Sequence, residues 1–148
     1  MKSSHAAACE LAEEVVRKFG TVRLRVQGTS MTPAIRPGDT ISIQRCHPRE
    51  IETGEIIFFS RDGRMYAHRV VQRIHADGEI KFVTQGDRMQ HPDPLVSAAE
   101  ILGRVVMIER GQRRIAPRSH IGKAARALGT ILRNSERATG LYLRLMPN

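Results

Sequence analysis

Residues 65–83 of this 148-residue chain, MYAHRVVQRIHADGEIKFV, decide the fold class, because an Asp-Gly pair separates two apolar runs. The pair Asp77-Gly78 is typical of a two-residue hairpin turn, and the flanking runs 70–74 and 80–83 are strand-like. We therefore predict an antiparallel hairpin that turns the strand bearing His68 back toward residue 87.

The same pattern of short apolar runs and turn pairs continues on both sides of this hairpin. The other turn pairs are Pro37-Gly38, Thr53-Gly54, Asp62-Gly63 and Gly86-Asp87. Because helix and strand patterns do not alternate, the sequence argues against a doubly wound sheet. We predict a mainly β fold, a compact domain of short hairpins over residues 21–116, with one helical segment before it and one after it.

Residues 1–20 predict a short helix, with Leu11, Val15 and Phe19 on one face and Gly20 as its end. The segment has no continuous apolar core, so it does not resemble a secretory signal peptide.

Residues 117–148 predict an amphipathic basic helix. On a helical wheel the apolar residues gather on one side and the basic residues on the other. The apolar set is Ile121, Leu128, Ile131, Leu132, Tyr142 and Met146, and the basic set is Lys123, Arg126, Arg133, Arg137 and Arg144. Such a helix either packs on protein or lies in the headgroup region of an anionic membrane, and the pattern leaves both options open.

The overall composition limits the partners and cofactors that we expect. A formal net charge of +9 and a pI near 10.7 favour anionic partners. Cys9 and Cys46 are too few for a disulfide framework or a zinc site and fit a reducing compartment, and we expect no metal and no cofactor. Aromatic residues make up 4% of the chain, and no DNA-binding motif is evident, so we expect no specific binding of nucleic acid.

The residues Ser30, His68, Asp87 and Asp93 supply the parts of a nucleophilic hydrolase. A serine hydroxyl needs an adjacent base to remove its proton during attack, and a neutral imidazole does this well. A carboxylate then holds the imidazole in one tautomer, and the sequence leaves open which of the two aspartates does so. With a histidine as the base, the rate should fall at acid pH as the imidazole gains a proton.

Six segments together resemble the type I signal peptidase family, in the archaeal and endoplasmic-reticulum branch that uses histidine instead of lysine. They are residues 28–33 (GTSMTP), 36–39 (RPGD), 54–59 (GEIIFF), 68–71 (HRVV), 81–87 (KFVTQGD) and Asp93. The resemblance implies a serine endopeptidase on a signal-peptidase and LexA-like β domain, which acts on precursor peptides or preproteins. It also implies small side chains just before the cleaved bond.

Position by position, the resemblance makes Ser30 the nucleophile, His68 the general base, Asp93 the third member and Asp87 a supporting carboxylate. Main-chain N–H groups near Gly28 and Met31 would form the oxyanion site. Two features depart from the family. Gly28 stands where members often carry a serine that binds the oxyanion, and the chain has no run of roughly 20 apolar residues that could span a membrane. We therefore expect the chain in the cytoplasm, either free or held peripherally at the inner face of the membrane through its C-terminal helix.

Two other functions stay open. A self-cleaving LexA-like repressor is disfavoured, because the chain lacks an N-terminal DNA-binding module and any Ala-Gly or Cys-Gly dipeptide, and has histidine in place of lysine. The second is a non-catalytic binding or regulatory protein with a LexA-like fold, which contacts anionic membrane or nucleic acid.

Overall fold

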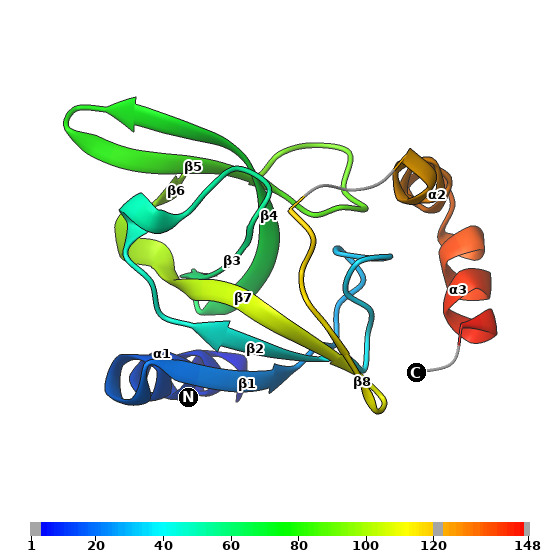
Figure 1. Ribbon diagram of the computed structural model, residues 1–148, viewed down its shortest axis with the longest axis horizontal. Helices are drawn as coiled ribbons and strands as arrows, with labels where there is room; N and C mark the ends of the chain where they lie inside the picture. Colours follow the sequence, from blue (N-terminus) through cyan, green and yellow to red (C-terminus); the bar gives the residue numbers. More distant parts are fainter. Residues whose placement is uncertain (1–3, 120–122, 147–148) are drawn as a thin grey trace.

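The protein, described by a computed structural model, consists mainly of antiparallel β-sheet with one helix before it and two short helices after it (Figure 1). The structure describes residues 4–119 and 123–146. The predicted fold class is confirmed. The elements, in chain order, are α1 (Ser4–Phe19), β1 (Thr21–Arg25), β2 (Thr40–Gln44), η1 (Pro48–Glu50), β3 (Ile56–Arg61), β4 (Arg64–Ala76), β5 (Glu79–Gln85), β6 (Val96–Ser97), η2 (Ala98–Glu100), β7 (Ile101–Arg110), β8 (Arg113–Ile115), α2 (Lys123–Asn134) and α3 (Glu136–Leu145).

Two of the predicted turn pairs form tight hairpins. Asp77 and Gly78, between β4 and β5, have φ angles of 54° and 75°, and Asp62 and Gly63, between β3 and β4, have φ angles of 51° and 70°. Positive φ at both central residues is the requirement of a type I′ turn, which Asp-Gly meets at low cost. The hairpins therefore align β3, β4 and β5, with His68 paired opposite Ile57.

The strand order in the sheet differs from the order along the chain. It runs β1-β2-β7-β3-β4-β5-β6, with β8 paired to β7, and every pair is antiparallel. The late strand β7 thus lies between β2 and β3. This insertion joins the N-terminal part of the sheet to the hairpins that carry His68.

Both faces of β3 are buried, each in its own apolar cluster. Ile56 and Phe58 belong to a first cluster that includes Met31 and Ile35, while Ile57 and Phe59 belong to a second cluster. Residues on one strand alternate between its two faces, so consecutive apolar residues serve both clusters. The run at residues 56–59 is therefore a core strand.

The helix α1 confirms the predicted N-terminal helix, but its buried face is different. Cys9, Ala12 and Val16 are buried, whereas Leu11 and Phe19 are 62% and 68% exposed. Small side chains let a helix approach a sheet closely, and a prediction based on large apolar residues misses such a face. The helix ends as predicted at Gly20, which has a φ of 75°.

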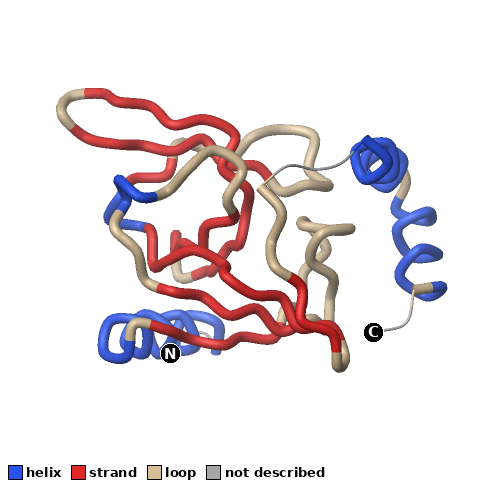
Figure 2. Tube along the Cα trace, viewed as in Figure 1, coloured by secondary structure: helices blue, strands red, loops and turns tan. Residues whose placement is uncertain are grey.

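The C-terminal segment forms two helices instead of one, because Ser135 interrupts it and caps α3 by accepting a hydrogen bond from the Ala138 N–H. Both helices lie at the end of the molecule opposite α1 (Figure 1), and loops lie between them and the strands (Figure 2). No helix within residues 4–119 and 123–146 is long and apolar enough to span a bilayer.

Candidate active site

Ser30 lies on the turn that follows β1. The Thr32 N–H donates to the Thr29 carbonyl at 3.1 Å, and the Ile35 N–H donates to the Met31 carbonyl at 3.0 Å. Met31 and Ile35 are 3% and 1% exposed and belong to the first core cluster. These apolar anchors directly after Ser30 hold the turn on the sheet and so fix where the hydroxyl can point.

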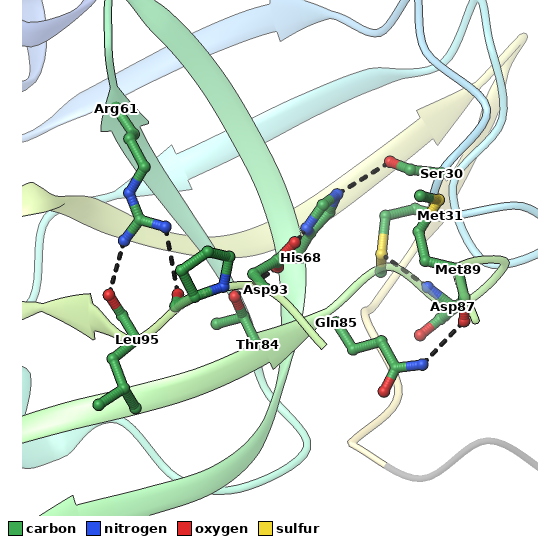
Figure 3. Close-up of polar contacts among 11 residues, drawn as sticks. Ser30, Met31, Arg61, His68, Thr84, Gln85, Asp87, Met89, Asp93 and Leu95 are labelled. Atoms are coloured by element: carbon green, nitrogen blue, oxygen red, sulfur yellow. Dashed lines mark hydrogen bonds and ion pairs between the residues drawn. The ribbon is translucent and has the colours of Figure 1, made fainter. Parts of the chain in front are cut away.

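His68 projects from β4 and connects Ser30 to Asp93. Its Nε2 lies 3.0 Å from Ser30 Oγ, and its Nδ1 lies 2.6 Å from Asp93 Oδ2 (Figure 3). The imidazole is buried beside the rings of Phe59 and Tyr66, with centroids 6.1 and 5.8 Å away. When Nδ1 carries the proton, the ring donates to the carboxylate and its Nε2 accepts from the hydroxyl. The three side chains then form one series of hydrogen bonds.

Asp93 is itself held by Thr84, a fully buried residue of β5. The Thr84 hydroxyl donates to Asp93 Oδ2 at 2.6 Å, and the Asp93 N–H donates to the Thr84 carbonyl at 2.8 Å. Burial raises the pKa of Asp93, but the hydrogen bonds from His68 and Thr84 outweigh it, so the pKa lies below its ordinary value of 3.8. Asp93 is therefore a carboxylate at neutral pH, as an acceptor for the imidazole must be.

Arg61, at the end of β3, holds the segment that follows Asp93 (Figure 3). Its guanidinium donates to the carbonyls of Pro94 and Leu95 at 3.1 and 2.7 Å, and to Glu100 at 2.6 Å. Glu100 also accepts from the N–H and the hydroxyl of Ser97, as in a capping box. This network connects the Asp93 loop to the sheet.

The Glu100→Gln variant should show how much this network stabilises the fold, because its contribution to the free energy of unfolding depends on pH. The Arg61 hydrogen bond, together with those from Ser97, lowers the pKa of Glu100 from 4.5 to about 2 against the effect of burial. A carboxylate with a lowered pKa stabilises the fold fully above its unfolded pKa and loses that effect as pH falls through its folded pKa. We expect Glu100→Gln to lower the free energy of unfolding by about 1 kcal/mol at neutral pH. Urea unfolding should show this difference shrinking below pH 4.5.

The exposed Glu79 provides a control for that experiment. Glu79→Gln removes the same charge from the β4–β5 hairpin without touching the Arg61 network, so it should change stability little at any pH. A Glu100→Gln deficit that stays constant from pH 7 to pH 3 would contradict the linkage to the charged form of Glu100.

Asp87 lies against Arg69 and not against the imidazole. The two side chains are 4% and 8% exposed and form a two-fold ion pair, with both N–O distances 2.8 Å. The Arg69 guanidinium also donates to the carbonyls of Gly54 and Arg118. Within the described residues no hydrogen bond joins Asp87 to His68, so the supporting role predicted for this carboxylate can act only on the backbone around the serine.

The loop at residues 86–89 packs directly against the serine. The Arg88 N–H donates to the Ser30 carbonyl at 2.9 Å, and the Asp87 N–H lies 3.4 Å from the sulfur of Met31. A Cβ at Gly86 would lie 2.7 Å from the Ser30 carbonyl oxygen, so only glycine fits this close approach. The Arg69–Asp87 ion pair thus holds the loop that in turn holds Ser30.

Main-chain N–H groups beside the hydroxyl are free to bind an oxyanion. In the part of the chain that the structure describes, the N–H groups of Gly28, Ser30 and Met31 donate to no protein acceptor. A Cβ at Gly28 would meet nothing within 4 Å, so the backbone there is open to an approaching group. Of these, Gly28 and Met31 are the positions that the sequence predicts for an oxyanion site, and Gly28 has no side-chain donor.

Two other features are separate from this constellation. Among the described residues, no three His, Cys, Asp or Glu side chains are grouped closely enough to hold a metal ion. A hollow of about 630 Å³ lies toward the far end of β4, where Arg73 and His75 line it together with His47 and Arg49. Ser30, His68 and Asp93 do not line it, so it is a poor candidate for the place where a bond is cut.

Comparison with known proteins identifies the family. Residues 2–106, well over half of the chain, match the Peptidase S24-like family. The chain belongs to this family.

Relatives of this S24-like chain include the signal peptidase complex catalytic subunit SEC11C from Homo sapiens, Canis lupus familiaris and Mus musculus. Each is 37% identical to it over 67 residues. The match covers 43% of this chain and 35% of each relative, so the chain spans about a third of the length of those proteins. The resemblance inferred from the motifs is confirmed.

Four residues of this S24-like site were not predicted from the sequence as functional. Thr84 and Gly86 lie inside the quoted motif but lack a chemical signature of their own. Arg69 offers a usable signal, because an arginine at a buried strand position needs an acidic partner. Arg61 offers none, since two of its acceptors are main-chain carbonyls at residues 94 and 95 and the third, Glu100, lies 39 residues further along the chain.

Proposed function

We propose that this chain is a serine endopeptidase of the signal peptidase type, in which Ser30, His68 and Asp93 carry out acyl transfer. The observation that carries the proposal is the unbroken series of contacts, 3.0 Å from hydroxyl to imidazole and 2.6 Å from imidazole to carboxylate. These distances suit proton transfer without any rearrangement of the protein. The reaction needs no group beyond this chain, a peptide and water.

In the first half of the reaction, Ser30 Oγ attacks the peptide carbonyl carbon while its proton passes to His68 Nε2. The carbonyl oxygen becomes an oxyanion, which the N–H groups of Ser30 and Met31 and the open backbone at Gly28 would bind. Asp93 stabilises the imidazolium that forms and keeps its Nδ1 proton in place. The imidazolium then gives its proton to the leaving amine, the C–N bond breaks, and an acyl-enzyme ester remains.

In the second half, water attacks the ester and loses a proton to His68 Nε2. Collapse of the second tetrahedral intermediate breaks the bond to Ser30 Oγ, which regains its proton from the imidazolium. The peptide acid leaves and the hydroxyl is restored. Each proton taken up by His68 is returned, so the side chains end the cycle as they began it.

The proposed substrates are precursor peptides or preproteins with small side chains just before the cleaved bond. Support comes from the family resemblance of the motifs and from the similarity to a signal peptidase catalytic subunit. The alternative of a non-catalytic binding or regulatory protein does not account for the alignment of three side chains from three separate segments. Self-cleavage is disfavoured by the absence of an Ala-Gly or Cys-Gly pair.

The cleavage specificity can be tested by mapping new N-termini. The purified protein is incubated with a library of precursor peptides, and the products are sequenced by mass spectrometry beside those of the Ser30→Ala variant. We expect cuts after small residues with the natural protein and none with the variant. Identical products from both proteins would point to a contaminating protease and contradict the proposal.

A further inference from the structure

The helices α2 and α3 lie outside residues 2–106, the part of the chain that matches the family. Their inner side packs on the protein. Leu132 and Thr139 are 1% and 3% exposed, and the Arg36 guanidinium donates to the Tyr142 hydroxyl at 2.7 Å. Family membership therefore does not account for these helices, and their outer side needs its own explanation.

The outer side of α3 combines large apolar residues with arginines. Leu141 and Leu145 are 58% and 67% exposed, and Arg137 and Arg144 are exposed beside them. Positions 137, 141, 144 and 145 are spaced as neighbours on one helix face. Ile131 and Met146, which belong with Leu132 and Tyr142 to the apolar set of the sequence, are also exposed, at 59% and 45%.

We propose that this outer face, defined by Arg137, Leu141, Arg144 and Leu145, docks on the surface of an anionic lipid bilayer. An exposed apolar stripe flanked by basic residues suits the boundary between headgroups and acyl chains. Basic residues near an anionic leaflet strengthen binding, and two arginines lie on this face. The lipid chains would receive the two leucines and the anionic headgroups the two guanidinium groups.

The outer face of α3 differs in charge from the exposed apolar surface of α1. Leu11 and Phe19 are as exposed as the two leucines of α3, but Glu10 and Glu14 flank Leu11 on the same helix. By sequence, α1 carries Glu10, Glu13 and Glu14 against Arg17 and Lys18. The pair α2–α3 carries Lys123, Arg126, Arg133, Arg137 and Arg144 against the single acid Glu136, which pairs with Arg88. An anionic surface should therefore select α3.

Docking through α3 would bring the serine turn close to the bilayer. The Arg88 guanidinium donates to Thr139 and Glu136 of α3, while the Arg88 main-chain N–H donates to the Ser30 carbonyl. One residue thus connects the helix to the turn. The docking itself does not depend on Ser30 being a nucleophile, so it can be tested without any measure of cleavage.

The test is sedimentation of the full chain with vesicles of phosphatidylglycerol and phosphatidylcholine, beside vesicles of phosphatidylcholine alone. We expect binding to the anionic vesicles only, weakened by high salt. The double variant Leu141→Glu, Leu145→Glu should lower the partition coefficient at least about 10-fold, since it removes two apolar groups and adds two negative charges. The matched variant Leu11→Glu, Phe19→Glu should bind as the natural protein does.

Several outcomes would overturn the proposal. They are equal binding of the α3 variant and the natural protein, equal losses in the α1 and α3 variants, and no binding to anionic vesicles. Sedimentation equilibrium without lipid tests a further outcome. If the natural protein forms a dimer and the α3 variant does not, the outer face of α3 binds a second copy of the chain and not lipid. Circular dichroism controls for folding. If the glutamates disturb the helix, Arg137→Gln with Arg144→Gln tests the same face, and unchanged binding would count against it.

Discussion

Replacing Ser30 with alanine is expected to lower kcat by roughly 10⁶-fold, because the variant has no oxygen to form the acyl-enzyme. Replacing His68 with alanine should cost nearly as much, since the hydroxyl then has no base within reach. The two residues act as one unit, so the double variant should be no worse than either single variant. Initial rates on a peptide identified by the N-terminal mapping, compared at saturating substrate, measure the effect.

The Ser30→Ala variant should lose its activity but keep its stability. The Ser30 hydroxyl bonds to His68, whereas buried Met31 and Ile35 anchor the turn itself. Thr29→Ala is a matched control, because it removes a hydroxyl from the same turn one residue earlier. Thermal unfolding should give similar midpoints for all three proteins, and only Ser30→Ala should be inactive. Turnover by pure Ser30→Ala would remove the serine from the mechanism.

Local chemistry explains why the hairpins could be predicted from the sequence. An Asp-Gly pair meets the dihedral demands of a type I′ turn, and the observed φ values at residues 77 and 78 are both positive. The same holds for residues 62 and 63. These turns determine how β3, β4 and β5 align, and a reader of the sequence needs no distant residue to find them.

The strand order and the inner face of α1 could not be found in this way. Placing β7 between β2 and β3 requires pairing over long separations, such as Ile41 with Ile108, which no local pattern encodes. The α1 face depends on small residues, Cys9 and Ala12, whose value lies in how closely the helix approaches the sheet. Both features are decided by packing between distant segments.

In the candidate site, too, some features could be predicted from the sequence, and others depend on contacts between distant segments. Ser30, His68 and Asp93 could be proposed because their residue types and motifs carry chemical information. The choice between Asp87 and Asp93 could not be made from the sequence, because it depends on Arg69, whose guanidinium takes both oxygens of Asp87. A carboxylate already paired with a buried arginine is unavailable to an imidazole. The order of Asp87 and Asp93 along the chain does not reveal this pairing.

The Asp93→Asn variant separates the two aspartates. The amide of asparagine can donate to Nδ1 and so favour the tautomer with the proton on Nε2, which cannot accept the serine proton. We therefore expect kcat to fall by roughly 10⁴-fold with little change in KM. The fold should survive, because the Thr84 hydroxyl contacts the same Asp93 atom as the imidazole and can accept from the second N–H of that amide. Steady-state kinetics measure the loss, and denaturant unfolding measures the stability.

The Asp87→Asn variant is the comparison, and its primary defect should be in folding. It leaves the Arg69 charge buried without its partner, which costs about 3–5 kcal/mol. The defect should therefore appear first in the denaturant midpoint and not as a pure loss of kcat in the folded protein. If instead Asp87→Asn were stable and inactive while Asp93→Asn kept its rate, the acid of the site would be Asp87.

The stability of the protein at acid pH independently tests the protonation state of Asp93. Its pKa is lowered in the folded protein, since the hydrogen bonds from His68 and Thr84 exceed the effect of burial. Its stabilising contribution is therefore complete above its ordinary value of 3.8 and is lost as pH falls through the lower, folded value. The difference in unfolding free energy between the natural protein and Asp93→Asn should accordingly shrink as pH falls below about 4. A difference that instead grew below about pH 4 would mean that Asp93 is held protonated, and a protonated acid could not stabilise the imidazolium on which both halves of the proposed reaction depend.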